Sequence, residues 1–229
     1  MDKEKWAKVS ECEKQWWISW KSRTDLGKSR EELIGRAKDI DQILKKHLQV
    51  ADRTILQIGP AANGEIHFLS GRRFAIDPLA SFFKDNFPQL IDTEVDFVDG
   101  FGEKMPYDDS RFDAIIMLNV LDHCFNPSAV LKEICRCLKK GGVLIFGVNL
   151  YSPTASILHK VFNFLDKEHP HAITSGYLKR QFRAEYNVLE ERFTQNIGYG
   201  PSFLKNTILR ILRLFKLSPV FYLLVARLV

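Results

Sequence analysis

A glycine-containing turn and the aspartate that follows it are the residues of this chain whose types and spacing first predict chemistry. Residues 55–64 read Ile-Leu-Gln-Ile-Gly-Pro-Ala-Ala-Asn-Gly, and Asp77 closes the next apolar run. Gly59 and Gly64 supply turn conformations that larger residues avoid, and Ala61 keeps side-chain bulk away from a ligand. Asp77 is placed to accept hydrogen bonds from a ribose diol. The pattern therefore predicts a nucleotide-cofactor site.

The turn alone permits two other interpretations. A strand, a glycine bend and an acidic residue also occur in α/β proteins that bind no nucleotide. The stretch from Gly59 to Gly64 fits a dinucleotide fingerprint in which Ala61 replaces the second glycine, so a nicotinamide oxidoreductase is also a candidate.

Apolar runs and helical patterns alternate along the chain, and this alternation positions the turn. We expect strands at 53–59, 73–77, 95–99, 112–119 and 143–149, with helices near 64–70, 79–87 and 127–139. Strands separated by helices predict a parallel sheet with right-handed crossovers, whose ligands bind beyond the carboxyl ends of the strands. The turn and Asp77 both fall on that edge.

Local signals predict where helices begin and end. Asn126 and Pro127 are typical of a helix N-cap and first position, and Gly141 is expected to end that helix. Ser29 with Glu32 forms a capping box for the second of two N-terminal helices. The two helices carry apolar stripes at helical spacing, Trp6, Val9, Trp16, Trp17 and Trp20 on the first and Leu33, Ala37, Ile40, Leu44 and Leu48 on the second.

Two further motifs follow the turn. From Gly100 the chain reads Gly-Phe-Gly-Glu-Lys-Met-Pro-Tyr-Asp-Asp-Ser-Arg-Phe-Asp-Ala-Ile-Ile-Met-Leu-Asn-Val-Leu-Asp-His, and from Leu131 Leu-Lys-Glu-Ile-Cys-Arg-Cys-Leu-Lys-Lys-Gly-Gly. Across residues 50–195 the chain resembles the class I S-adenosylmethionine-dependent methyltransferases, particularly those with small-molecule and lipid-like acceptors. The resemblance implies a Rossmann-like, doubly wound, seven-stranded α/β sheet with an antiparallel last strand, and S-adenosylmethionine as the cofactor.

The resemblance also assigns residues to the cofactor. The turn would lie under its methionine moiety, Asp77 would bind the ribose, the segment from Phe101 would flank the adenine, and Asn119 would lie beside the sulfonium. The cofactor-binding set is Gln57, Gly59, Ala61, Gly64, Asp77, Pro78, Phe101, Gly102, Glu103 and Asn119.

Three residues depart from the family pattern. Gln57 stands where the family usually has a carboxylate near the cofactor's amino group, so a charge-assisted contact becomes a neutral one. Phe101 replaces an aspartate that commonly bonds the adenine amino group. Lys140 replaces a proline before the glycine pair, which should be harmless. The first two substitutions raise the alternative of an S-adenosylmethionine-binding protein without catalysis.

Histidines are the candidate catalytic bases. A hydroxyl acceptor must lose its proton when it is methylated, and an imidazole that titrates near neutral pH is suited to take it. The resemblance places His123 at the start of the acceptor wall, and the helix that returns toward the sixth strand must begin on the carboxyl edge, near His171 and His169. We rank them His123, His171 and His169; the alternative is that each only fixes its loop. No strong metal-site spacing is found, and we expect no metal.

Length and composition are consistent with one enzyme-sized domain over residues 1–229 whose cysteines are in the reduced state. The chain carries a formal net charge of +5 and four cysteines without zinc-type spacing, and its N-terminus lacks an apolar signal core. No run of 18 or more apolar residues is present, so we expect a cytoplasmic protein. The basic residues show no arrangement typical of nucleic-acid binding, which disfavours RNA as a partner.

Four parts are expected: an N-terminal helical cap at 1–50, a cofactor-binding core at 51–149, a lid with an acceptor loop at 150–173, and a helix–strand part at 174–229. The expected lid follows the fifth strand. The alternative interpretation of this segment is an extra helix that packs on the rest of the domain and has no role in substrate binding. Thr174 is expected to cap the following helix. Strand six near 187–194 pairs with an antiparallel final strand at 220–229.

A basic amphipathic helix is expected in the last part. The insertion 202–217 contains an apolar face and a basic face over 204–216, which predicts peripheral contact with an anionic membrane or, alternatively, packing on the protein itself.

From these patterns we expect methyl transfer to a small or lipid-like acceptor, with an oxygen atom weakly favoured. An enzyme acting on RNA or protein is the remaining alternative. The oligomeric state is not predicted.

Overall fold

The computed structural model describes residues 3–50, 52–154, 156, 171–182, 185–195 and 220–229. Most of the expected lid at 150–173 and the whole insertion at 202–217 lie outside these residues, as does His169. The predicted lid, membrane contact and division into parts therefore stay predictions. No helix in the described ranges has both the length and the apolar character that a membrane span needs.

Seven strands form one sheet in the order β3-β2-β1-β4-β5-β7-β6. The strands are β1 (Thr54–Ile58), β2 (Arg72–Asp77), β3 (Asp96–Asp99), β4 (Phe112–Leu118), β5 (Leu138–Leu150), β6 (Tyr186–Gln195) and β7 (Val220–Leu228). The first five pair in parallel, while β7 runs antiparallel between β5 and β6. This topology confirms the expected Rossmann-like α/β sheet with an antiparallel last strand.

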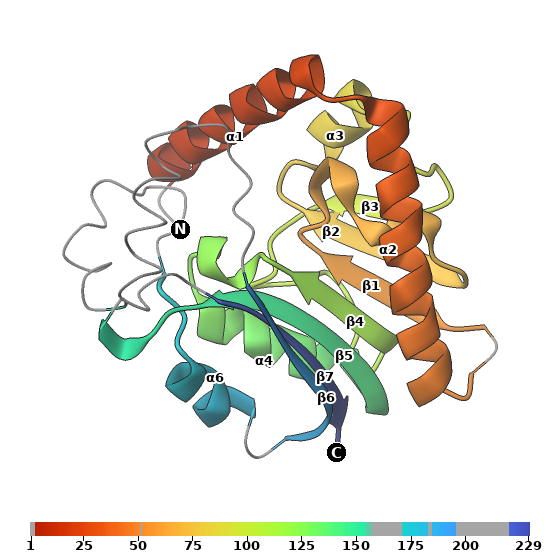
Figure 1. Ribbon diagram of the computed structural model, residues 1–229, viewed down its shortest axis with the longest axis vertical. Helices are drawn as coiled ribbons and strands as arrows, with labels where there is room; N and C mark the ends of the chain where they lie inside the picture. Colours follow the sequence, from red (N-terminus) through yellow and green to blue (C-terminus); the bar gives the residue numbers. More distant parts are fainter. Residues whose placement is uncertain (1–2, 51, 155, 157–170, 183–184, 196–219) are drawn as a thin grey trace.

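Helices cover both faces of the sheet (Figure 1). The helices are α1 (Lys3–Arg23), α2 (Leu26–His47), α3 (Ala80–Asn86), α4 (Pro127–Cys137) and α6 (Ser175–Phe182), with short 3₁₀ helices η1 (Ala61–Asn63), η2 (Glu65–Phe68) and η3 (Leu121–His123). On β4, Ala114 and Ile116 face the cluster built with α2 and α3, whereas Ile115 and Met117 face the cluster built with α4 and α6. Alternation along the strand therefore divides the core into two layers.

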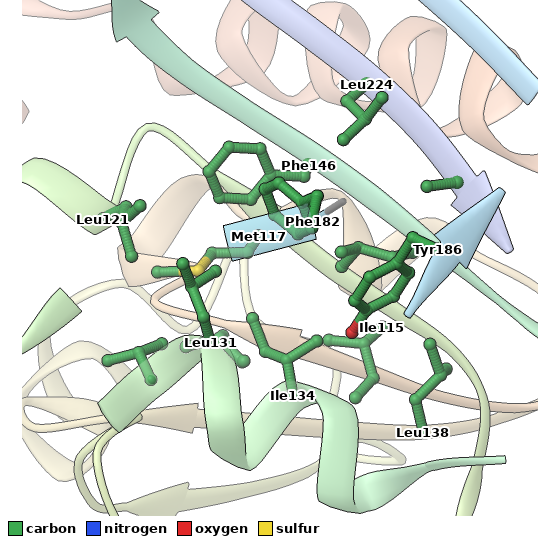
Figure 2. Packing of buried hydrophobic residues seen from close by; sticks show 14 of the residues in the cluster. Ile115, Met117, Leu121, Leu131, Ile134, Leu138, Phe146, Phe182, Tyr186 and Leu224 are labelled. Atoms are coloured by element: carbon green, nitrogen blue, oxygen red, sulfur yellow. The ribbon is translucent and has the colours of Figure 1, made fainter. Parts of the chain in front are cut away.

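Figure 2 shows the second of these layers, where α4 packs on the sheet. Leu131 and Ile134 of α4 meet Ile115 and Met117 of β4, and Phe146 packs edge-to-face against Phe182 of α6, with ring centroids 5.4 Å apart. Burial of these side chains fixes α4 and α6 against the sheet because apolar surface is removed from water.

The first helix, α1, lies against α3. Trp17 is buried against Phe83 and Phe87, with ring centroids 5.3 and 5.7 Å away, and Lys21 donates to the carbonyl of Asn86. Trp16 remains about half exposed, so only part of the predicted tryptophan stripe is core. The contacts of Trp17 hold α1 against α3, the helix that follows β2.

Several predicted boundaries are confirmed. Asn126 accepts a hydrogen bond from the Ala129 amide at 3.1 Å and Pro127 opens α4. The Tyr177 amide donates to Oγ1 of Thr174 at 3.2 Å, as expected for the cap of α6. The apolar stripe of α2 is buried as predicted.

Two predicted helix boundaries were wrong. The second helix is capped by Asp25, whose carboxylate accepts from the amides of Gly27 and Lys28, so the helix begins before Ser29. The helix expected to end at Gly141 ends at Cys137, because Leu138 turns to extended backbone and pairs with Phe112 in the sheet. Gly141, with φ of +74°, instead lies where the register shifts between β4 and β5.

The helix expected at 64–70 is replaced by η1 and η2. The amide of Ile66 donates to Oε1 of the Gln57 side chain, at 2.8 Å, rather than to a helical carbonyl. This hydrogen bond to another element attaches η2 to β1.

Candidate functional site

The carboxyl ends of four parallel strands come together at one edge of the sheet. Ile58 of β1 pairs with Ile76 of β2 and with Met117 of β4, and Asp77 pairs with Asp99 of β3. The turn after β1, Asp77, the segment at Phe101 and Asn119 therefore lie on one edge, as the sequence predicts for a ligand site.

The turn after β1 depends on its glycines in two different ways. Gly59 has φ of +63° and donates its amide to the Ile76 carbonyl at 2.9 Å. A Cβ there would lie 2.7 Å from both methyl carbons of Val120, so backbone conformation and contact with the end of β4 each require glycine. Gly64 has an ordinary φ of −75°, which corrects the expectation of a special turn conformation. It is glycine because an added Cβ would lie 2.2 Å from Cβ of Pro60.

Asp77 binds the turn itself. Its Oδ2 accepts from the Ala61 amide at 3.1 Å and its Oδ1 from the Leu79 amide at 2.9 Å. Ala61 has φ of +50°, which directs its amide at the carboxylate. Pro78 is half-buried in the turn between β2 and α3. The carboxylate that is predicted to hold a ribose thus also fixes the backbone that follows β1, at Ala61, and the backbone that follows β2, at Leu79.

Burial raises the pKa of Asp77 from 3.8 to about 7. The amide of Leu79 opposes that shift, the carboxylate of Glu13 on α1 adds to it, and Ala61 and Asp99 contribute less. Asp77 is only 6% exposed. Glu13 was not among the sequence-predicted site residues, because nothing in the pattern of α1 indicates which strand end it approaches.

Gln57 belongs to a buried polar network that the sequence did not reveal. Its Nε2 donates to Oε2 of Glu65 at 2.9 Å, while its Oε1 accepts from the Ile66 amide. Glu65 in turn accepts from Nε of Arg36 on α2 at 2.8 Å. Gln57 itself carries no charge, but the carboxylate of Glu65 lies beside it on η2, and Arg36 ties α2 to this part of the chain.

The segment after β3 packs against the start of α4. Gly102 is close to Ile58 and Val130, where an added Cβ would lie 3.2 Å from each side chain. Glu103 accepts from the amides of Phe125 and Asn126 at 2.8 and 3.2 Å, and the ring of Phe101 lies 6.5 Å from that of Phe125. Glu103 thus holds the backbone just before α4. The sequence predicted only that Glu103 would lie beside the adenine, not this contact.

The end of β4 carries the predicted acceptor wall. Asn119 is exposed with φ of +58°; its amide donates to Gly147 at 2.8 Å and its Oδ1 accepts from Asn149 at 2.7 Å. His123, also exposed, ends η3, and the amide of His171 donates to the carbonyl of Asp122 at 3.3 Å. The structure therefore brings the segments of His123 and His171 together.

Asp122 and Cys124 flank His123 on the buried side of η3. Asp122 is 0% exposed, and within the described ranges neither of its carboxylate oxygens has a hydrogen-bond partner. Burial raises the pKa of the Cys124 thiol, which disfavours the thiolate that a nucleophile requires. Sequence reasoning did not select Asp122, since an acid within an apolar strand end gives no periodic signal.

No cluster of three or more histidine, cysteine, aspartate or glutamate side chains that could hold a metal ion is found among the residues that the structure describes.

Comparison with known proteins places this edge in a family context. Residues 65–146 match the family model described as a methyltransferase domain. The structure is similar to that of a protein from Bacillus halodurans C-125, with a TM-score of 0.64, 16% identity, and coverage of 83% of this chain and 98% of that chain.

It is also similar to the geranyl diphosphate C-methyltransferase of Streptomyces coelicolor A3(2), solved with Mg²⁺, geranyl diphosphate and S-adenosylhomocysteine. That TM-score is 0.63 at 15% identity, over 84% of this chain and 77% of the other. At such identities the structural likeness shows the fold.

A curated relative, an uncharacterized protein of Methanocaldococcus jannaschii, is 38% identical over 47 residues. The match covers 20% of this chain and 23% of that relative.

Proposed function

We propose that this chain, which belongs to the class I S-adenosylmethionine-dependent methyltransferases, transfers a methyl group to a small or lipid-like acceptor. The observation that carries the proposal is the tight turn after β1, closed onto the carboxylate of Asp77 at the edge where four strands end. A ligand that lies across this edge meets backbone amides and one buried acid, which suit a nucleoside with a ribose diol.

The turn after β1 does not tolerate side chains at its two glycines. An added Cβ would lie 2.7 Å from Val120 at Gly59 and 2.2 Å from Pro60 at Gly64, so a substitution at either position would displace the turn that is proposed to lie under the methionine moiety. S-adenosylmethionine supplies an activated methyl group on a sulfonium. The protein must then orient the acceptor and exclude water.

The acceptor class is supported by three features. The geranyl diphosphate C-methyltransferase, with the same fold, acts on an isoprenoid diphosphate by its name. The sequence predicts an apolar face for the lid and for the insertion at 202–217. The exposed Trp16 and Ile18 add apolar surface on α1. We propose an oxygen atom as the site of methylation, with His123 taking the proton of the acceptor hydroxyl.

Calorimetry tests the cofactor part of the proposal. The purified protein should bind S-adenosylhomocysteine, and a protein that binds neither this product nor S-adenosylmethionine would contradict the proposal. Tritiated S-adenosylmethionine incubated with a lipid and small-molecule extract should label an acceptor. Binding without transfer would favour a non-catalytic role, and label lost on nuclease or protease treatment would favour RNA or protein.

The His123→Ala variant should lower methyl transfer by about 10²-fold while S-adenosylhomocysteine affinity stays near normal, because only proton removal is lost. The measurement is initial transfer rate with labelled cofactor. His47→Ala is the matched control, since His47 on α2 bonds Glu190 and lies outside the proposed site. Normal turnover in the His123 variant would limit this histidine to a scaffold role.

A further inference from the structure

Asp122 is exceptional among the buried acids of the described chain. Asp113 is buried as well, but it accepts from the Thr54 amide at 2.9 Å and from Lys139 at 2.8 Å. Glu65 and Asp77 also have both carboxylate oxygens bonded. Asp122 is 0% exposed and, in the described ranges, both of its oxygens are without a partner. Because buried polar groups in native proteins are almost always bonded, this exception calls for an explanation.

No donor among the described residues bonds the carboxylate oxygens of Asp122. Leu121 precedes it and is fully buried in the core layer with α4, and the neighbouring Cys124 directs its thiol to the Val120 carbonyl at 3.3 Å. A carboxyl group in such a place destabilises the folded chain, since it has lost water without gaining a donor. A group retained at that cost is typical of functional sites.

The location of Asp122 indicates which function. It lies in η3, three residues beyond Asn119 at the carboxyl end of β4 and next to His123. Its carbonyl accepts from the amide of His171, so it joins the strand end to the segment before α6. Both segments belong to the proposed acceptor wall.

We infer that Asp122 binds the methyl acceptor, by accepting a hydrogen bond from an O–H or N–H group next to the atom that is methylated. The inference rests on the proposed function. The acceptor supplies the donor that is missing among the described residues, and this hydrogen bond satisfies the carboxyl group. An acceptor without such a hydrogen leaves Asp122 as it is in the free protein and therefore binds more weakly than one that donates to it. The ligand class is therefore a hydroxylic or amine-bearing small molecule or lipid.

Two variants test this assignment. Asp122→Leu should raise the Tm by roughly 3 to 8 °C, because an apolar side chain replaces a buried carboxyl group that has no hydrogen-bond partner among the described residues, and Asp122→Asn is the variant closest in shape. Both should lower labelled methyl transfer into the extract by at least about tenfold, while the dissociation constant of S-adenosylhomocysteine changes by less than about twofold. Asp113→Asn is the matched control: a buried acid with partners, whose loss should lower the Tm.

The outcomes separate the inference from the proposed function. A lower Tm in both Asp122 variants, or a higher Tm with transfer unchanged, would overturn the role of Asp122 alone. A wild-type protein that fails to bind S-adenosylhomocysteine would overturn the proposed function and this inference with it. A higher Tm together with lost transfer and retained cofactor affinity supports the assignment.

Discussion

Replacing Asp77 with asparagine is expected to remove a fall in stability between about pH 4 and pH 7. Burial raises the pKa of Asp77 from 3.8 to about 7. In this window the folded chain holds a proton that the unfolded chain has released, so the free energy of unfolding decreases as the pH rises. The shift corresponds to up to roughly 4 kcal/mol, and asparagine, which does not titrate, contributes none of it.

Urea unfolding across that pH range measures the effect as the difference between wild type and variant. The difference is needed because His67 acts in the opposite direction. Burial lowers the pKa of His67 from 6.5 to about 4, so its contribution to stability is lost as the pH falls from about 6.5 to 4. His67 is common to both proteins and cancels. Parallel pH profiles for the two proteins would show that Asp77 ionises normally in the fold.

Gly59→Ala should destabilise the protein by roughly 2 to 5 kcal/mol and abolish measurable S-adenosylhomocysteine binding. A residue with a Cβ pays about 1 to 2 kcal/mol at the φ of +63°. The clash with both Val120 methyl carbons, 2.7 Å from the new Cβ, adds about 1 to 3 kcal/mol and displaces the turn. Chemical denaturation and calorimetry measure the two effects.

Two controls separate strain from the clash. Gly141→Ala introduces a Cβ at φ of +74° with nothing within 4 Å, so it should show the conformational cost alone. Adding Val120→Ala to Gly59→Ala removes both methyl groups and should recover part of the stability. If the Gly59 and Gly141 variants lose equal free energies of unfolding, the contact with Val120 contributes nothing to the destabilisation.

The strands were predictable because their signals are local. Apolar runs such as Ile55 to Ile58 and Phe112 to Leu118 are buried on both faces, which a parallel sheet between two helical layers requires. The N-cap at Asn126 depends on its own neighbours alone. The family motifs then placed the turn and Asp77 on the correct edge.

The errors and omissions share a non-local cause. Residues 65–68 form a 3₁₀ helix, and its Ile66 amide bonds the side chain of Gln57 on another element, a contact that no local pattern reveals. Where α4 ends is decided by the pairing of Leu138 with Phe112. Asp122 and Glu65 became candidate site residues only when their burial and hydrogen-bond partners were known. The sequence does not show whether a carboxylate is paired, unpaired or exposed to solvent.

The position of β7 restricts the order in which the sheet can be completed. The strand is the last described part of the chain, yet it lies between β5 and β6 and supplies the backbone partners of both. During synthesis, β6 emerges from the ribosome well before the strand it pairs with. Until β7 has emerged, β6 has no strand partner and β5, which already pairs with β4, keeps one edge open, so chaperones would have one unpaired strand and one open sheet edge to protect.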